Sequence, residues 1–416
     1  MPNAEAAVAV PRCRLCDNPL TTTFVDLGMS PPCESFLLPE QLDTMERTYP
    51  LHVRVCNDCL LVQLPSYVDP DDVFSEYAYF SSFSDSWVAH AERYAEAMID
   101  RLGLDGASLV AEVASNDGYL LQHFVSRGIP VVGVEPAANI AEVAVSKGIR
   151  TEVQFLGQGT GTDVASRYGK ADLVAANNVY AHVPDLIDFT KGLRALVADD
   201  GWVTIEVQHL LRLIERRQYD TIYHEHFQYY TVLTLIRALR SGGLEVIDVE
   251  ELPTHGGSVR VFARPVEIAG KPSAAVQRVL DEEEAAGLHT VEGHAGFAKD
   301  VLRIKSDLLQ FLIGAAREGK TVAGYGAPGK GNTLLNHCAI RTDLLSYTVD
   351  RNPYKHGRFL PGTHVPVFGT DKLEETRPDY VLVLPWNLRD ELVEQLKYVA
   401  EWGGQLVFPI PALEIV

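Results

Sequence analysis

The chain has 416 residues and a formal net charge of −20, from 36 Lys and Arg against 56 Asp and Glu. This length is too great for one hydrophobic core and predicts two or three domains. The acidic balance argues against a general nucleic-acid or membrane-binding surface, and no run of about 18 apolar residues is present to span a membrane.

The amino-terminal residues 1–12 lack a basic start and a long apolar core, so we expect no secretory signal and a cytoplasmic protein. In a reducing compartment, six cysteines favour metal ligation over disulfides.

Two C-x-x-C pairs are the first motif, Cys13 with Cys16 and Cys56 with Cys59, and 39 residues separate them. Each pair offers two thiolates from a tight turn, and two such turns complete a tetrahedral Cys₄ zinc site. Because no coordination position would stay open, we expect the metal to be structural. The long spacing between the two pairs means that residues 24–48 must loop out. The alternatives are a redox pair or unrelated buried thiols. Cys33 and Cys338 lack a partner at ligand spacing and are expected in the core or as neutral surface residues.

An aromatic and hydroxyl-rich segment spans residues 69–90 and precedes a helical pattern over 87–102. The segment could lie as a lid beside a ligand, and Tyr77 and Tyr79 are the candidates for contacting it. The alternative for either tyrosine is core packing.

Residues 108–121, SLVAEVASNDGYLL, predict a buried strand, a tight polar turn and the start of a helix. Gly118 lets the backbone approach a ligand, and the free N–H groups of the helix favour an electronegative group. Glu135 ends the next apolar run, where its carboxylate could accept hydrogen bonds from ribose hydroxyls. The turn looks like the first motif of S-adenosylmethionine-dependent methyltransferases, E-x-x-x-x-D-G, although an ordinary strand-to-helix turn is the alternative. The cofactor-site candidates are Glu112, Ala114, Asn116, Asp117, Gly118, Glu135 and Asn177.

Strands and helices alternate from residue 109 onward. Strands are expected over 109–113, 131–135, 151–155, 172–177, 202–207, 244–249 and 257–263, with a helix over 185–197. Alternation predicts a parallel, doubly wound sheet, and the short last connection predicts an antiparallel final strand. This is the seven-stranded arrangement of methyltransferases, in which ligands bind beyond the carboxyl ends of the strands.

The fourth strand ends in NNVYAH, residues 177–182, where a substrate should meet the methyl donor. We assign Asn178 to substrate binding. His182 could hydrogen-bond a substrate or a reacting group, and a loop histidine with a structural hydrogen bond is the alternative.

Tyr223, His224, Glu225 and His226 form the densest group of proton-transferring side chains in the chain. Histidine can abstract a proton near neutral pH, a carboxylate can orient it or take the proton itself, and tyrosine can donate to an oxyanion. Tyr223 and His226 are three residues apart and can face one way. Methylation of carbon requires such groups, because a carbanion must form next to a carbonyl. The alternative is a structural polar turn.

The carboxyl-terminal third begins with two predicted helices within residues 271–319. Residues 321–332, TVAGYGAPGKGN, then repeat the strand, glycine loop and helix scheme, followed by strands over 346–350, 380–384 and 405–409. Gly326 and Lys330 in this loop suit a diphosphate, and Asn352 follows the second of these strands. We favour the nucleotide part of a substrate here over an NAD site or a second S-adenosylmethionine site.

Together, the Cys₄ pairs, EVASNDGYL, NNVYAH, YHEHF and GYGAPGKGNTLLN resemble the zinc-containing sugar C-methyltransferases of deoxysugar biosynthesis in antibiotic pathways. The resemblance covers the whole chain and is greatest to the branch serving the D-tetronitrose pathway. It implies a zinc-binding domain over 1–75, an S-adenosylmethionine-binding domain over 76–275 and a smaller Rossmann-like domain for the nucleotide sugar over 276–416.

This resemblance also implies the chemistry. The substrate would be dTDP-3-amino-2,3,6-trideoxy-4-keto-D-glucose, methylated at carbon 3, with the 3-hydroxy analogue as the alternative. His226 would be the base, assisted by Tyr223 and Glu225, with Tyr77 and His182 lining the same pocket. The residues alone do not choose between Glu225 and His226. We expect a monomer with no nucleic-acid or membrane partner. An NAD-dependent nucleotide-sugar oxidoreductase and a noncatalytic zinc-dependent scaffold remain the other classes.

Overall fold

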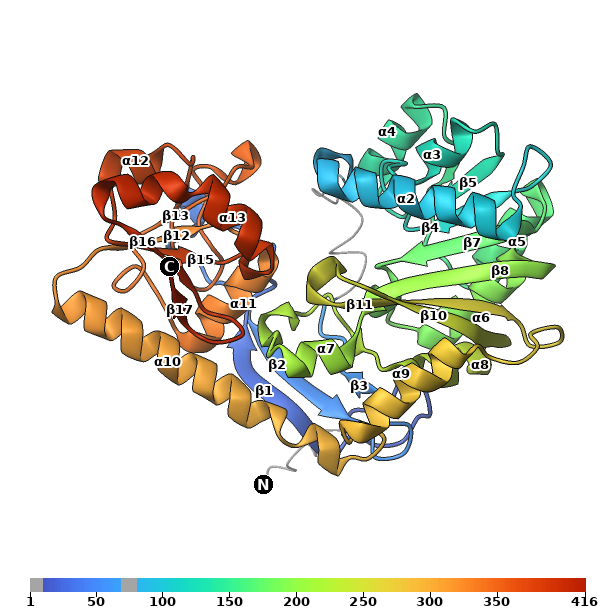
Figure 1. Ribbon diagram of the computed structural model, residues 1–416, viewed down its shortest axis with the longest axis horizontal. Helices are drawn as coiled ribbons and strands as arrows, with labels where there is room; N and C mark the ends of the chain where they lie inside the picture. The colour runs from blue at the N-terminus through green and yellow to red at the C-terminus, as the bar shows by residue number, and fades with distance from the viewer. Residues whose placement is uncertain (1–9, 69–80) are drawn as a thin grey trace, which may run out of the picture. The chain divides into compact units, whose positions relative to one another are not determined.

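The computed structural model describes residues 10–68 and 81–416 (Figure 1). These residues form two compact units, and each unit gathers segments that are far apart in the sequence. The first unit comprises Met1–Thr21, Val55–His209 and Phe227–Val291, and the second comprises Thr22–Arg54, Leu210–His226 and Glu292–Val416. Because both units are discontinuous, they do not match three consecutive domains one to one, and the division at residues 75 and 275 stays a prediction.

The first unit is built on the expected seven-stranded sheet, with strand order β10-β11-β8-β7-β4-β5-β6. The neighbouring pairs among β8, β7, β4, β5 and β6 are parallel, and β11 is antiparallel to both β8 and β10. The strands are β4 (Val110–Val113), β5 (Val131–Val134), β6 (Thr151–Glu152), β7 (Ala171–Asn177), β8 (Val197–Gln208), β10 (Leu244–Leu252) and β11 (Ser258–Pro265). The predicted parallel sheet with an antiparallel last strand is confirmed.

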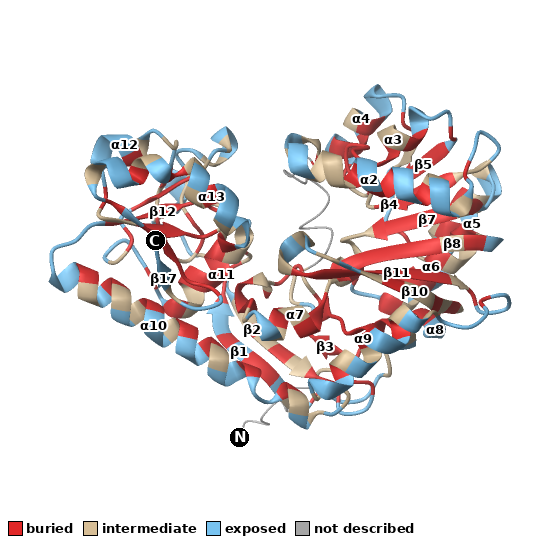
Figure 2. Cartoon of the chain, in the orientation of Figure 1, coloured by how far each residue is buried: buried red, intermediate tan, exposed pale blue. Residues whose placement is uncertain are grey.

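Helices cover both faces of this sheet, because alternate strand residues point to opposite sides. Val110 and Leu173 pack with α2 and α3, whereas Ala111 and Val174 pack with α6 and α8. Figure 2 shows the resulting buried layer along the strands. The helices of this unit are α2 (Asp85–Leu102), α3 (Leu121–Val125), α4 (Ala138–Ser146), α5 (Gln158–Tyr168), α6 (Leu186–Leu196), α8 (Val232–Ser241) and α9 (Ala274–Ala285).

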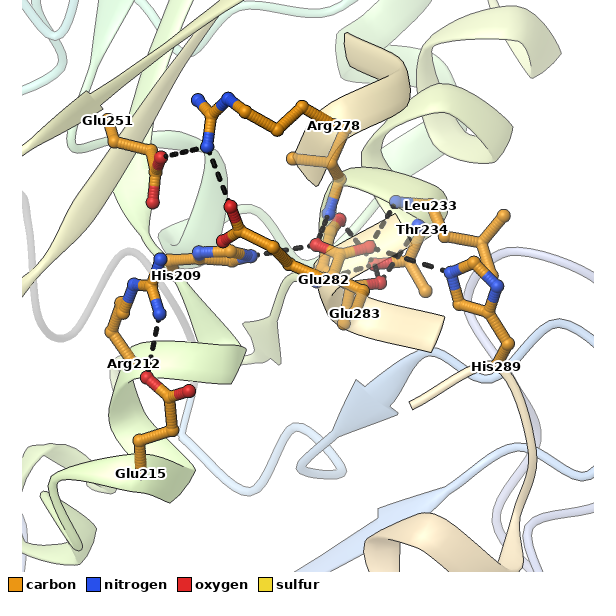
Figure 3. Close-up of polar contacts among 12 residues, drawn as sticks. His209, Arg212, Glu215, Leu233, Thr234, Glu251, Arg278, Glu282, Glu283 and His289 are labelled. Carbon is orange, nitrogen blue, oxygen red and sulfur yellow. Dashed lines mark hydrogen bonds and ion pairs between the residues drawn. The ribbon is translucent and has the colours of Figure 1, made fainter. Parts of the chain in front are cut away.

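A fully buried carboxylate attaches α9 to the rest of the first unit (Figure 3). Glu283 accepts hydrogen bonds from the backbone N–H groups of Val232, at 2.5 Å, and Leu233, at 3.1 Å, in the first turn of α8. The His209 Nε2 atom lies 2.7 Å from the same carboxylate, and His209 is fully buried as well. Glu283 therefore holds α9, the start of α8 and the residue that follows β8 together.

The second unit contains a six-stranded sheet with strand order β14-β13-β12-β15-β16-β17, parallel except for β17. The chain builds outward from β12 to one side and then crosses to β15 on the other, which is the order of a doubly wound fold. The strands are β12 (Val322–Tyr325), β13 (Thr348–Val349), β14 (Val367–Phe368), β15 (Tyr380–Val383), β16 (Gln405–Phe408) and β17 (Glu414–Ile415).

The remaining elements of the second unit are mostly helices. The expected pair within residues 271–319 is present as α9 and α10 (Phe297–Arg317). α11 (Gly329–Cys338) follows the glycine loop as predicted, and α7 (Leu210–Glu215), α12 (Lys372–Thr376) and α13 (Arg389–Gln395) are short. Of the helices in residues 10–68 and 81–416, none has both the length and the apolar character that a membrane span requires.

Several strands were not expected from the sequence. β1 (Thr22–Ser30) includes the start of the segment predicted to loop out, β2 (Tyr49–Val55) follows that segment, and the two-residue strands β3 (Val62–Gln63) and β9 (Gln228–Tyr229) pair antiparallel. The predicted strand over 151–155 is reduced to two residues. Such short strands depend on partners distant in sequence, so local patterns predict them poorly.

Candidate functional site

The four cysteines of the two C-x-x-C pairs come together in the first unit. Their sulfur atoms all lie within 4.8 Å of one another, with 3.4 Å between Cys13 and Cys59 and 3.5 Å between Cys16 and Cys56. A zinc ion with Zn–S distances of about 2.3 Å places tetrahedral sulfurs about 3.8 Å apart, so the four thiolates fit the metal. Four sulfur ligands fill its coordination sphere, which makes the site structural.

Both cysteine turns have the same local conformation. The N–H group of Asp17 donates to the Cys13 carbonyl at 2.9 Å, and that of Leu60 donates to the Cys56 carbonyl at 3.1 Å. Asp17 and Leu60 both adopt left-handed backbone conformations, with φ of 61° and 64°. The two turns thus present their cysteine pairs in the same way. Most of the segment between the pairs belongs to the second unit.

The cofactor loop follows β4 and has an unusual backbone. Ala114, Asn116 and Gly118 have φ values of 55°, 48° and 78°, which wind the chain tightly between β4 and α3. A Cβ atom on Gly118 would lie 2.3 Å from Ile149 Cδ1, the mobile end of a side chain, so it is the positive φ that favours glycine here.

Three acidic side chains meet at this loop. Glu112 and Asp117 are buried, and burial together with the charges of Glu135 and Asp117 raises the pKa of Glu112. The Glu135 carboxylate accepts from the backbone N–H groups of Asn116 and Ala137, each at 2.9 Å. Among the described residues, Glu112 Oε2 and Asp117 Oδ1 are buried with no hydrogen-bond partner. Unpaired acidic oxygens beside a strand end fit a positively charged, hydroxyl-bearing cofactor.

The loop after β7 offers further unpaired groups. The backbone N–H group of Asn178 donates to the Glu206 carbonyl oxygen at 2.7 Å. Asn178 has a left-handed backbone conformation, with φ of 56°. In the described part of the chain, Asn177 Oδ1 and Asn178 Nδ2 are buried without hydrogen-bond partners. His182 lies in the following 3₁₀ turn, and its neighbour Ala181 accepts from the N–H group of Phe227 at 2.7 Å.

An ion cluster at the end of β8 was not predicted from the sequence. The buried Glu206 carboxylate contacts Arg260 at 2.7 Å, His90 at 3.1 Å and Thr254 at 2.9 Å. Burial alone would raise the pKa of Glu206, but His90 and Arg260 hold it at about 2. The cluster joins α2 to β8 and β11. Sequence reasoning missed it because each residue stands in an unremarkable local pattern.

Tyr223 and His226 face each other in the second unit, as their spacing predicted. Their ring centroids lie 4.0 Å apart, and the planes are inclined by 34°. His226 Nδ1 lies 2.9 Å from the Thr221 carbonyl oxygen, which can only accept, so Nδ1 carries the proton. His224 instead lies against β2, with Nε2 3.3 Å from the Tyr49 carbonyl oxygen. The structure thus brings Tyr223 and His226 together and separates His224 from them, while the proton-transfer roles of these residues stay predictions.

Glu225 lies in an apolar and acidic environment. Its carboxyl group is buried and 4.0 Å from Cys33 Sγ. Burial, with the nearby charge of Glu34, raises the pKa of Glu225 to about 8. The group therefore holds its proton at neutral pH and can donate a hydrogen bond.

The glycine loop of the second unit lies beyond the carboxyl end of β12. Gly326 has φ +85°, and a Cβ there would lie 2.6 Å from Pro385. Lys330 lies in the first turn of α11, with Nζ 4.6 Å from the centre of the Trp386 ring. Asn352 is tied to this loop through Asp350, which accepts from the N–H groups of Asn352 and Ala327 at 2.8 and 2.7 Å. Gly326, Lys330 and Asn352 are thus gathered in one region.

Two sequence candidates, Tyr77 and Tyr79, lie outside the described residues. Their predicted roles stay predictions.

Comparisons with known proteins give mutually consistent matches along the chain. A zinc-binding-domain model matches residues 13–74, a methyltransferase-domain model matches 87–249, and a model of the C-methyltransferase C-terminal domain matches 253–411. C-methyltransferase NovU of Streptomyces niveus is 35% identical over 407 residues, which are 98% of this chain and 97% of that protein. The chain belongs to the C-methyltransferase family. Its cofactors are S-adenosylmethionine, the methyl donor, and a structural zinc ion.

Solved structures resemble less than half of this C-methyltransferase. An S-adenosylmethionine-dependent methyltransferase from Clostridium acetobutylicum ATCC 824 is 10% identical with a TM-score of 0.33, covering 42% of this chain and 90% of that chain. Magnesium protoporphyrin IX methyltransferase from Synechocystis PCC 6803, with bound SAH, is 16% identical with a TM-score of 0.34, covering 42% of this chain and 82% of that chain. At these TM-scores the similarities carry no argument about substrate or mechanism.

Proposed function

We propose that this C-methyltransferase methylates carbon 3 of a dTDP-linked 4-keto deoxysugar, as a cytoplasmic monomer in antibiotic deoxysugar biosynthesis. The observation that carries the proposal is the paired arrangement of Tyr223 and His226, with a protonated Glu225 in the same short segment. O- and N-methylation need at most a modest base, whereas a carbon nucleophile requires a proton acceptor and an oxyanion donor together.

His226 is the base in this proposal. Because its Nδ1 donates to the Thr221 carbonyl oxygen, the neutral ring carries its lone pair on Nε2, the atom that would accept the substrate proton. Glu225 has a pKa of about 8 and holds its own proton at neutral pH, so it is poorly suited to remove another. These surroundings support His226 over Glu225 as the base.

The reaction requires a proton to leave carbon 3 and a methyl group to arrive there. His226 Nε2 takes the proton, and the electron pair moves into the carbonyl group to give an enolate whose charge rests on the 4-keto oxygen. Tyr223 and the protonated Glu225 supply hydrogen-bond donors for that oxygen. When bound, S-adenosylmethionine would supply an electrophilic methyl group: the bond from carbon 3 to the methyl group would form as the sulfur–methyl bond breaks, leaving S-adenosylhomocysteine, and the carbonyl group would be restored. The proton then leaves His226 for solvent, which restores the base.

The substrate's nucleotide is assigned to the glycine loop of the second unit. Gly326 allows a close backbone approach, Lys330 provides a cation for the diphosphate, and Asn352 lies beside them. Asn178, His182, Tyr77 and Tyr79 are proposed to contact the sugar. The favoured sugar is dTDP-3-amino-2,3,6-trideoxy-4-keto-D-glucose of the D-tetronitrose pathway, with the 3-hydroxy analogue as the alternative. Parallel assays with both substrates distinguish them.

A second candidate function is an NAD-dependent nucleotide-sugar oxidoreductase. It is favoured by the doubly wound strand order of the second unit, which is typical of dinucleotide sites. Equilibrium binding of NAD and of S-adenosylmethionine separates the two functions, and we expect saturable binding of S-adenosylmethionine alone.

The decisive experiment is incubation with the dTDP-4-keto sugar and methyl-labelled donor in deuterated water. We expect the label and solvent deuterium exchange at the same carbon. His226→Asn should lower turnover by about 10²–10⁴-fold, the usual contribution of a general base. A product methylated on oxygen or nitrogen would refute the function. Full turnover by His226→Asn, with none by Glu225→Gln, would exchange the roles of the two residues.

A further inference from the structure

The first two turns of α11 contact the segment that carries the base at several points. Thr333 Oγ1 donates to the Ile222 carbonyl oxygen at 3.0 Å. Asn332 Nδ2 donates at 2.6 Å to the carbonyl oxygen of Cys33, whose sulfur atom lies beside Glu225. The helix that begins at the glycine loop thus also supports the proton-transferring residues.

Asp220 is the charged member of this connection, and the mechanism above does not use it. Its side chain is fully buried, and its Oδ2 accepts from Trp386 Nε1 at 2.6 Å. Its Oδ1 has no hydrogen-bond partner among the described residues. A fully buried carboxylate is retained only where a nearby cation or donor compensates for the lost water.

The compensating cation is Lys330. Its ammonium group lies 4.6 Å from the centre of the same Trp386 ring and hydrogen-bonds Asn387, and its charge lowers the pKa of Asp220, which burial raises to about 6. Asp220 in turn raises the pKa of Lys330, which burial holds at about 8. The two charges therefore interact through space, and both side chains contact the Trp386 indole ring.

Asp220 stands immediately before Thr221, whose carbonyl oxygen fixes the proton on His226 Nδ1. The 3₁₀ turn Tyr219–Thr221 includes both residues, so a displacement of Asp220 displaces that carbonyl group. A continuous path thus leads to the His226 imidazole. It starts at the Lys330 ammonium and passes through the Trp386 indole, Asp220 and Thr221.

We propose that Asp220 is a positioning residue that couples binding of an anionic substrate group at Lys330 to the orientation of the His226 imidazole. This inference rests on the proposed function, because it takes Lys330 as the cation for the diphosphate and His226 as the base. An arriving diphosphate competes with Asp220 for the Lys330 charge. The electrostatic interaction between Asp220 and Lys330 then differs between the free and bound states, which is the condition for coupling two sites.

The test uses the full chain without a methyl donor, so it does not depend on turnover. The protein is labelled with ¹⁵N-histidine, the His226 imidazole signals are identified by their loss in His226→Asn, and thymidine diphosphate is added. We expect the His226 signals and their titration midpoint to shift in the wild type. In Asp220→Asn, which keeps an acceptor for Trp386 but loses the charge, thymidine diphosphate should still bind while the His226 shift falls by more than half.

A tryptophan pair separates coupling from general structural damage. Trp386→Phe keeps the ring beside Lys330 but removes the donor to Asp220, and it serves as the second variant if Asp220→Asn fails to fold. Trp402→Phe is the matched control, because its Nε1 donates at 3.0 Å to the Pro378 carbonyl in the same unit. We expect the His226 response to weaken in Trp386→Phe and to persist in Trp402→Phe.

Kinetics supply a second readout in an enzyme that passes the carbon-methylation test. Asp220→Asn should lower kcat about 10-fold through a misplaced base, with a smaller change in the KM for S-adenosylmethionine. An unchanged His226 response in Asp220→Asn, no response in the wild type, or equal losses in the two tryptophan variants would each overturn the coupling. Failure of the proposed function would appear separately, as absence of carbon-methylated product from the wild-type enzyme.

Discussion

Removing the Glu283 carboxylate is expected to be among the most destabilising single changes in the first unit. Glu283→Ala would leave the N–H groups of Val232 and Leu233 and the His209 imidazole without their acceptor, all in a buried region. Each buried donor left unpaired costs about 1–3 kcal/mol. Because the three share one carboxylate, their losses are not additive, and breaking such a buried group costs about 3–5 kcal/mol in total.

The measurement is urea-induced unfolding followed by circular dichroism, with matched variants of α9. Glu284→Ala is the control, since Glu284 is the next residue of the same helix and is exposed, and its change should stay within about 0.5 kcal/mol. Glu283→Gln keeps one acceptor oxygen and should lose about 2 kcal/mol. A loss below about 1 kcal/mol for Glu283→Ala, or equal losses for the two alanine variants, would refute the reasoning.

Four further outcomes are expected. One zinc ion per chain should be found by atomic emission, and Cys13→Ser or strong chelation should remove it and lower the unfolding temperature. Glu206, with a pKa of about 2, contributes stability that is present above its unfolded pKa of about 4.3 and is lost as the pH falls toward 2, on the order of 3 kcal/mol in total. Because His90 and Arg260 both lower this pKa, Arg260→Met should remove part of the acid dependence in urea titrations at several pH values. The rate should fall above pH 8 as Glu225, with a pKa of about 8, ionises, and a pH–rate profile of Glu225→Gln should lack this alkaline decline. Solvent deuterium should enter carbon 3 of the sugar nucleotide without methyl donor, as judged by mass spectrometry; exchange that strictly requires the donor would contradict this.

The parts predicted from the sequence are those in which neighbouring residues carry the signal. The seven-stranded sheet follows from alternating apolar runs, the zinc cluster from two short cysteine spacings, and the Tyr223–His226 contact from a three-residue interval. In each case the predictive signal is a short residue spacing or a local hydrophobic pattern that can be read directly from the sequence.

Buried ionic groups could not be predicted in this way. Glu283, Glu206 and Asp220 occupy ordinary positions in helical or strand patterns, and their partners are 48 to 166 residues away along the chain. A carboxylate is tolerated at such positions only because donors from other elements converge on it. A single sequence shows the carboxylate but does not show that donors from distant elements surround it. The same reason explains why the membership of residues 210–226 in the second unit was not expected.

This membership has a chemical consequence. The second unit contains Tyr223, Glu225 and His226 together with the glycine loop proposed to hold the nucleotide. The first unit contains Asp117 and the rest of the cofactor loop. In the proposed function, the groups that remove the proton from carbon 3 and the group that binds the nucleotide therefore belong to one compact unit. Within that unit α11 contacts the segment that carries His226, so we expect the geometry of the base not to depend on a bound methyl donor. We therefore predict that proton removal and methyl transfer are separable steps, and that a variant of the cofactor loop loses the second while it retains the first.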